Sequence, residues 1–152
     1  MQRWWGEPFS GAKLALIHDG AVVAYRRDEK AGIPFPGQWD LPGGGREGAE
    51  SPEGCVSREL HEEFGLVLPA SRLIWSRRYA ARSDAGLCSF FFGAIGCGHE
   101  IDRIAFGSEG ICWTMMPIDE FVSRQDAVPG LRARLADCVA DLGGLGRITP
   151  PA

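Results

Sequence analysis

Lysine is scarce in this chain of 152 residues: only Lys13 and Lys30 accompany the arginines among its 16 basic residues. Acidic residues number 20, so the formal net charge is -4. A protein that binds the backbone of duplex nucleic acid usually carries an excess of positive charge. The charge balance therefore argues against duplex nucleic acid as a partner.

Long apolar runs are also missing. The longest stretch without a charged residue extends from Ala85 to Gly98. It is shorter than the roughly 18 residues that a membrane-spanning helix needs. The opening residues, MQRWWGEPFS, lack the apolar core of a secretory signal. We therefore expect a cytoplasmic protein with no membrane partner.

The sequence has few cysteines, and none of them form a C-x-x-C motif. The five cysteines are Cys55, Cys88, Cys97, Cys112 and Cys138. Such pairs are the usual signature of a structural zinc site, whereas disulfide frameworks belong to secreted chains. We expect reduced and mostly buried thiols.

The remaining composition is that of an ordinary globular domain, with 45% hydrophobic and 24% charged residues. The length suits one domain over residues 1–152. Strand-like segments mixed with a few helices indicate an α/β or α+β fold, with the helices packed on a sheet. The expected strands are Lys13–His18, Ala21–Arg26, Trp39–Leu41, Leu73–Tyr79, Leu87–Ile95 and Gly110–Met116; a hairpin turn is expected at Asp19-Gly20 and a polar turn at Arg82–Gly86; the expected helices are Ser51–Glu63, a short helix from Pro117, and Leu131–Leu142.

The helix after Ser51 carries the most chemical information. Ser51 is a good N-cap, and three carboxylates, Glu59, Glu62 and Glu63, fall in one arc beside an apolar stripe. Like charges near a helix C-terminus destabilise the helix. A hard cation such as Mg²⁺ would suit this place, although acidic clusters are also common on solvated helix faces.

The residues around this helix favour the metal-binding interpretation. They follow the pattern G-x5-E-x7-R-E-U-x-E-E-x-G-U, in which U is a bulky aliphatic residue. This pattern resembles the Nudix box, and the preceding WDLPG segment also resembles the approach to that box. The specified positions are filled by Gly44, Glu50, Arg58, Glu59, Leu60, Glu62, Glu63, Gly65 and Leu66, and the one small departure is Ala49, where many members have Gly.

The resemblance implies a Nudix-type α/β/α sandwich with a mixed sheet. It implies a pyrophosphohydrolase that uses Mg²⁺ or Mn²⁺ to cleave a nucleoside diphosphate linked to another moiety. It also implies that Glu59, Glu62 and Glu63 bind metal with a backbone carbonyl near Gly43 or Gly44, and that one carboxylate activates water. Arg58 and Glu50 would tie the loop of the box to its helix.

A further carboxylate often lies in a late loop of such proteins. Glu109 stands between glycines just before an expected strand, so we prefer it to Glu100 or Asp102 as a metal ligand or general base. A simple turn residue is an equal alternative. For substrate binding, Arg27 can grip phosphate oxygens and Trp39 can stack on a base, although Trp39 also suits the core.

Subfamily markers are mostly missing. The proline that usually follows the box in ADP-ribose hydrolases is absent, and Tyr79 is too near the box for the diadenosine-polyphosphate pattern. A MutT-like hydrolase of a (d)NTP or modified (d)NTP is our first expectation. Hydrolysis of a nucleotide sugar, ADP-ribose or a dinucleotide is the alternative, as is a non-catalytic nucleotide-binding regulator. We expect a monomer or homodimer, in which Trp4 and Trp5 cover a sheet edge or mediate the dimer.

Overall fold

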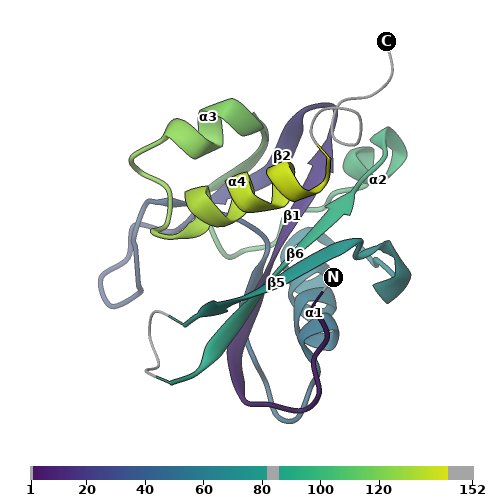
Figure 1. The fold of residues 1–152 in the computed structure, drawn as a ribbon. Helices are drawn as coiled ribbons and strands as arrows, with labels where there is room; N and C mark the ends of the chain where they lie inside the picture. The colour runs from purple at the N-terminus through teal and green to yellow at the C-terminus, as the bar shows by residue number, and fades with distance from the viewer. Residues whose placement is uncertain (1, 82–85, 144–152) are drawn as a thin grey trace.

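The computed structural model describes residues 2–81 and 86–143, and Figure 1 shows a sheet with helices on both of its faces. The central strands β1 (Phe9–His18) and β6 (Cys88–Ile95) run parallel, whereas the other strand pairs are antiparallel. The sheet is therefore mixed, as expected. Its order is β3-β2-β1-β6-β5, with β4 added to β1 and β7 to β2; the bounds are β2 (Ala21–Arg26), β3 (Trp39–Asp40), β4 (Gly43–Gly45), β5 (Trp75–Ala80) and β7 (Cys112–Pro117).

The hairpin between β1 and β2 forms as the Asp-Gly pair predicts. Asp19 and Gly20 both have positive φ, 53° and 74°, as a two-residue turn of this kind requires. The two strands pair only next to the turn, where Ile17 lies opposite Val22. Beyond that point β1 and β2 diverge and leave a wedge between them.

Residues 39–45 fill this wedge. β3 pairs with β2 on one side, and β4 pairs with Gly11–Lys13 of β1 on the other. Gly43 has φ 130°, and a Cβ on it would come within 2.1 Å of the Ala12 carbonyl oxygen. The backbones therefore approach so closely that only glycine fits, which brings the start of the box against β1.

Two helical layers cover the sheet. The helix α1 (Pro52–Phe64) packs on one face and the helices α3 (Ile118–Ser123) and α4 (Leu131–Asp141) on the other, which makes the expected sandwich. Strand side chains alternate between the two layers: Leu14 of β1 belongs to the α1 cluster and Ala15 to the α4 cluster. None of the described helices is long and apolar enough to cross a membrane.

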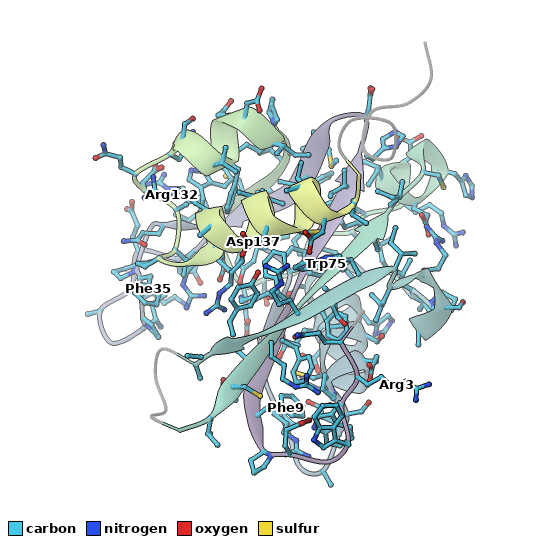
Figure 2. All side chains as sticks on the ribbon, viewed as in Figure 1. Arg3, Phe9, Phe35, Trp75, Arg132 and Asp137 are labelled. Carbon is cyan, nitrogen blue, oxygen red and sulfur yellow. The ribbon has the colours of Figure 1, made fainter. Side chains whose placement is uncertain are left out.

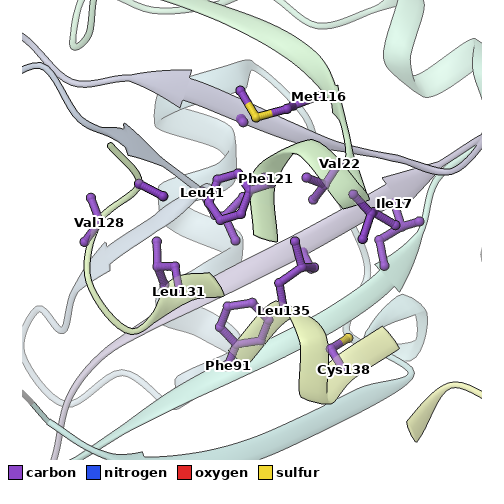
Figure 3. Packing of buried hydrophobic residues seen from close by; sticks show 14 of the residues in the cluster. Ile17, Val22, Leu41, Phe91, Met116, Phe121, Val128, Leu131, Leu135 and Cys138 are labelled. Carbon is purple, nitrogen blue, oxygen red and sulfur yellow. The ribbon is translucent and has the colours of Figure 1, made fainter. Parts of the chain in front are cut away.

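The space between α4 and the sheet is filled by apolar side chains. Figure 3 shows Leu135 and Cys138 of α4 facing Phe91 and Ile17 of the sheet. At its edge, Asp137 of α4 accepts a hydrogen bond of 2.8 Å from the Tyr79 hydroxyl, and Figure 2 shows Asp137 near Trp75 of β5. These contacts hold α4 to the outer strand of the sheet.

Several boundaries differ from the expected ones. β1 begins at Phe9 rather than Lys13, because residues 9–12 find partners in β6 and β4 that lie far along the chain. Three elements were not predicted: β4, the short 3-10 helix η1 (Ala70–Arg72) and the helix α2 (Gly98–Asp102). The expected turn at Arg82–Gly86 falls mostly outside the described residues. The other shifts are one or two residues: β3 ends at Asp40, α1 spans Pro52–Phe64, β5 spans Trp75–Ala80, β6 starts at Cys88, β7 spans Cys112–Pro117, α3 starts at Ile118 and α4 ends at Asp141.

Candidate active site

The helix α1 presents the three box carboxylates because its other side is tied to the core. Its N-terminus is capped by the Ser51 hydroxyl, which accepts a hydrogen bond of 3.0 Å from the Gly54 N–H. Val56, Leu60 and Phe64 are fully buried. This fixes the rotation of the helix, so that Glu59 and Glu62 lie at its partly exposed edge and Glu63 points inward.

A later loop closes the C-terminal end of α1. The Ala105 N–H donates to the Phe64 carbonyl and the Gly107 N–H to the Glu63 carbonyl, each at 2.9 Å. These bonds satisfy carbonyls that the end of a helix leaves without partners. They also bring the loop that carries Glu109 next to the carboxylate end of α1.

Arg58 is the hub of the charged edge. Its guanidinium donates to both carboxylate oxygens of Glu50, at 2.8 and 3.0 Å, and to the Gly45 carbonyl at 2.9 Å. The pKa of Glu50 falls to about 2, chiefly because of the hydrogen bonds from Arg58. The loop of the box is thereby tied to the helix, as the resemblance to the Nudix box implies for Glu50 and Arg58.

The same guanidinium also holds two of the expected metal ligands. The Arg58 Nη1 atom lies 3.0 Å from a Glu59 oxygen and 3.2 Å from a Glu62 oxygen. One cationic atom is thus shared by both carboxylates. The donors are hard oxygens, as Mg²⁺ and Mn²⁺ prefer, so this part of the box fits a divalent cation in its chemistry.

Glu63 occupies a different environment. Its side chain is buried, and one carboxylate oxygen accepts a hydrogen bond of 2.8 Å from the Gly43 N–H. Burial raises the pKa of Glu63 to about 7, against the opposing effects of Lys13 and the Gly43 N–H. Glu63 can therefore exchange a proton near neutral pH.

Gly44 lies directly against Glu59. A Cβ on Gly44 would stand 2.7 Å from the carboxyl carbon of Glu59. Burial raises the pKa of Glu59 above its ordinary value. The Gly44 carbonyl, an expected ligand, accepts a hydrogen bond of 3.5 Å from the thiol of Cys55. In residues 2–81 and 86–143 no three carboxylate, thiol or imidazole side chains surround a common point closely enough to coordinate a metal.

Glu109 is exposed and lines a cavity of about 230 Å³, to which Tyr25 of β2 also contributes. Arg27 lines the same cavity, while its Nη1 atom pairs with Asp40 at 2.9 Å. The alternatives to Glu109 differ from it. Glu100 is engaged by Arg72 through two hydrogen bonds of 2.8 Å, and Asp102 ends the helix α2 in solvent.

Trp39 lies partly buried against the cluster under α4, with the Arg124 guanidinium 5.5 Å from its ring centre. This supports the packing interpretation that the sequence analysis weighed against base stacking. The structure also shows a residue that sequence reasoning missed. Asp40 is buried at 1% exposure and pairs with Lys13 and Arg27. The sequence did contain a signal for a buried, paired carboxylate, because Asp40 stands between Trp39 and Leu41 in an expected strand.

Comparison with known proteins gives the family. A family model described as NUDIX domain matches residues 10–138 of the chain. The chain belongs to the Nudix family. Its box is thus part of a match that extends from β1 to α4, and the resemblance seen in the sequence is confirmed.

Relatives of this Nudix chain include nucleoside triphosphatase NudI of Escherichia coli O139:H28 (strain E24377A / ETEC), 44% identical over 53 residues. That alignment covers 35% of this chain and only 37% of NudI. A MutT-like protein of Streptomyces ambofaciens is 29% identical over 123 residues, 81% of this chain and 72% of that protein. The crystal structure of a MutT protein from Methanosarcina mazei Go1 has a TM-score of 0.70 at 17% identity, covering 91% of this chain and 99% of that chain, which confirms the fold.

Proposed function

We propose that this Nudix chain is a pyrophosphohydrolase that depends on Mg²⁺ or Mn²⁺. Its substrate would be a nucleoside diphosphate linked to another moiety, with a (d)NTP or modified (d)NTP as the first candidate. Two relatives support this choice by their names, a nucleoside triphosphatase and a MutT-like protein. Both alignments are partial or distant, so the substrate has to be tested directly.

One observation carries the proposal: Arg58 Nη1 bonds Glu59 and Glu62 at once, at 3.0 and 3.2 Å. Both carboxylates can therefore bind a single positively charged group at the helix edge. The Gly44 backbone lies against Glu59, which adds a carbonyl oxygen to the donor set. When bound, a divalent cation would neutralise charge on the phosphate oxygens and lower the pKa of a bound water.

The residues of the chain divide the remaining work. Arg58 holds the loop of the box on α1 and orients Glu59 and Glu62. Glu63, whose pKa burial raises to about 7, and Glu109, which lines the cavity beside Arg27, are our two candidates for accepting a proton from water. The substrate would bind at the cavity of about 230 Å³ that Arg27 and Glu109 line, with Arg27 binding its phosphate oxygens. Trp39 packs on the core, which favours packing over base stacking for this residue.

The test is a substrate screen with Mg²⁺ or Mn²⁺, reading release of phosphate and pyrophosphate. It should include the (d)NTPs, oxidised (d)NTPs, ADP-ribose, a nucleotide sugar and a dinucleoside polyphosphate. We expect turnover of a (d)NTP that stops in excess chelator and returns with added metal. Turnover that persists after exhaustive metal removal would refute the metal requirement. Binding of nucleotides without any turnover would favour the non-catalytic regulator.

A matched pair of variants ties the activity to this site. Glu59→Gln removes a carboxylate that faces Gly44, whereas Glu53→Gln changes the first turn of the same helix, remote from the other carboxylates. We expect Glu59→Gln to lower kcat by orders of magnitude and Glu53→Gln to leave it within a few-fold of the wild type. Equal effects would place the chemistry elsewhere.

A further inference from the structure

Lys13 is one of the two lysines in the chain. Its ammonium group donates hydrogen bonds to three acceptors within the protein. The Nζ atom donates to the Asp40 carboxylate at 3.0 Å, to the Leu41 carbonyl at 3.2 Å and to the Gly43 carbonyl at 3.1 Å. An ammonium group has three protons, so each proton has an acceptor. Lys13 therefore joins β1 to residues 40–43 of the wedge.

Asp40 anchors this ammonium from the other side. Its carboxylate is buried at 1% exposure and accepts from Lys13, from Arg27 at 2.9 Å and from the Tyr25 hydroxyl at 3.1 Å. Its second oxygen also accepts from the Leu41 N–H at 2.7 Å. A buried charge with this many partners is held in one place, because losing a partner would leave it uncompensated.

The backbone of Gly43 is consequently held at both of its polar groups, which belong to the two successive peptide units on either side of its Cα. Its carbonyl accepts from Lys13 at 3.1 Å, and its N–H donates to the Glu63 carboxylate at 2.8 Å. Gly44 follows directly, with Glu59 against its Cα. Lys13 thus holds the peptide unit that leads into Gly44, while Glu63 is held by the preceding peptide unit, and the two units meet at the Cα of Gly43.

We propose that Lys13 is a positioning residue that fixes the Gly43–Gly44 backbone and Glu63 for binding a divalent metal. The inference rests on the proposed function. It also explains the residue type in a chain whose other basic residues, apart from Lys30, are arginines. Three acceptors converge on a single nitrogen here, whereas the planar fork of arginine directs its donors along one plane.

The sign of the effect separates positioning from plain electrostatics. A positive charge close to Glu63 repels a metal cation, so if Lys13 acted only through its charge, its removal would tighten metal binding. If Lys13 positions the ligands, its removal weakens metal binding, because a ligand backbone and a carboxylate lose their fixed geometry. Loss of such an outer support typically weakens metal affinity by roughly 10–100-fold.

The experiment measures Mn²⁺ binding to the full chain by electron paramagnetic resonance, without nucleotide. We expect Lys13→Met to raise the Kd for Mn²⁺ at least about tenfold. Lys13→Arg keeps the charge and should also weaken binding, because the fork cannot serve the three acceptors. The matched control is Lys30→Met, since the Lys30 side chain is 72% exposed and pairs with Asp28. Its Kd should equal that of the wild type.

Each outcome decides the proposal. Unchanged or tighter Mn²⁺ binding by Lys13→Met overturns it, as does full affinity in Lys13→Arg. Thermal unfolding of the metal-free variants checks that each one is folded, and if Lys13→Met is not, Lys13→Arg decides alone. Absence of Mn²⁺ binding by the wild type would refute the proposed function and this inference together. Normal wild-type binding with a normal Lys13→Met variant would refute only the inference.

Discussion

At the scale of single residues, Glu63 is a buried carboxylate, and its ionised form destabilises the folded protein when no metal is bound. The side chain is 8% exposed, and burial raises its pKa from 4.5 to about 7. The folded state therefore holds a proton that the unfolded state releases at lower pH. Protonated Glu63 thus contributes to the free energy of unfolding. This contribution is fully present below the pKa that Glu63 has in the unfolded state, and it is lost as the pH rises through about 7.

This predicts a pH-dependent gain from Glu63→Gln. The amide keeps an oxygen for the Gly43 N–H but never ionises. We expect the variant, without metal, to have an unfolding free energy about 1–3 kcal/mol higher than the wild type at about pH 8, and a much smaller gain at about pH 5. Urea unfolding in chelator at the two pH values measures it. Glu62→Gln, whose side chain is 55% exposed, is the matched control for replacing a carboxylate by an amide on the same helix.

Leu60 and Glu62 are two positions apart on α1 and should fail in different ways. Leu60 is 1% exposed in the core, whereas Glu62 lies at the helix edge and accepts a hydrogen bond from Arg58. We expect Leu60→Ala to cost about 2–5 kcal/mol of stability through a cavity. Glu62→Gln should instead lower kcat by orders of magnitude with nearly unchanged stability. Near-wild-type kcat for Glu62→Gln at saturating metal would remove this residue from the proposed metal site.

At the scale of elements, the loop before β7 tests which outer carboxylate takes part. Glu109 lines the cavity next to Arg27, and two backbone hydrogen bonds hold its loop on the end of α1. Glu100, by contrast, accepts a hydrogen bond of 2.8 Å from Arg72. We expect Glu109→Gln to lower kcat/KM far more than Glu100→Gln or Asp102→Asn.

The measurement is a comparison of the three amide variants over a range of pH. If Glu109 is the base, its variant should also flatten the rise of kcat/KM at alkaline pH. A mild Glu109→Gln beside an inactive Glu100→Gln or Asp102→Asn would reassign the outer ligand. Three mild variants would leave the chemistry to the carboxylates of α1.

The elements also show what the sequence could predict. The helix α1 was predictable because its cap, its apolar stripe and its terminal Gly65 all act within one segment. The strand β4 was not, since three glycines give no strand pattern and become a strand only by pairing with β1. The same holds for the site. Its box residues were readable in order, but the ion pair of Lys13 and Asp40 joins separate strands, which only the tertiary structure brings together.

At the scale of the whole molecule, the N-terminal segment lies along the outer strand β5. The Gln2 N–H donates to the Ser76 hydroxyl of the outer strand β5 at 3.0 Å, and that hydroxyl donates back to the Gln2 carbonyl at 2.9 Å. The Arg78 guanidinium lies 4.2 Å from the centre of the Trp5 ring. Gln2 therefore covers part of the edge of the sheet. Trp4 packs edge-on against Phe9, with 5.9 Å between the ring centres, a packing role that the sequence analysis did not expect.

Deleting residues 2–7 should accordingly uncover the edge of β5. Exposed strand edges promote pairing between molecules, so we expect the truncated protein to self-associate and to unfold at a lower temperature. Sedimentation velocity and thermal unfolding measure the two effects. Trp5→Ser is the matched control: Trp5 is 74% exposed, so its loss removes apolar surface while Gln2 still covers Ser76. The variant should resemble the wild type in both measurements. A wild-type dimer that Trp5→Ser converts to a monomer would instead assign this tryptophan to a dimer interface, and a truncated protein that stays monomeric with unchanged stability would show that the edge needs no cover.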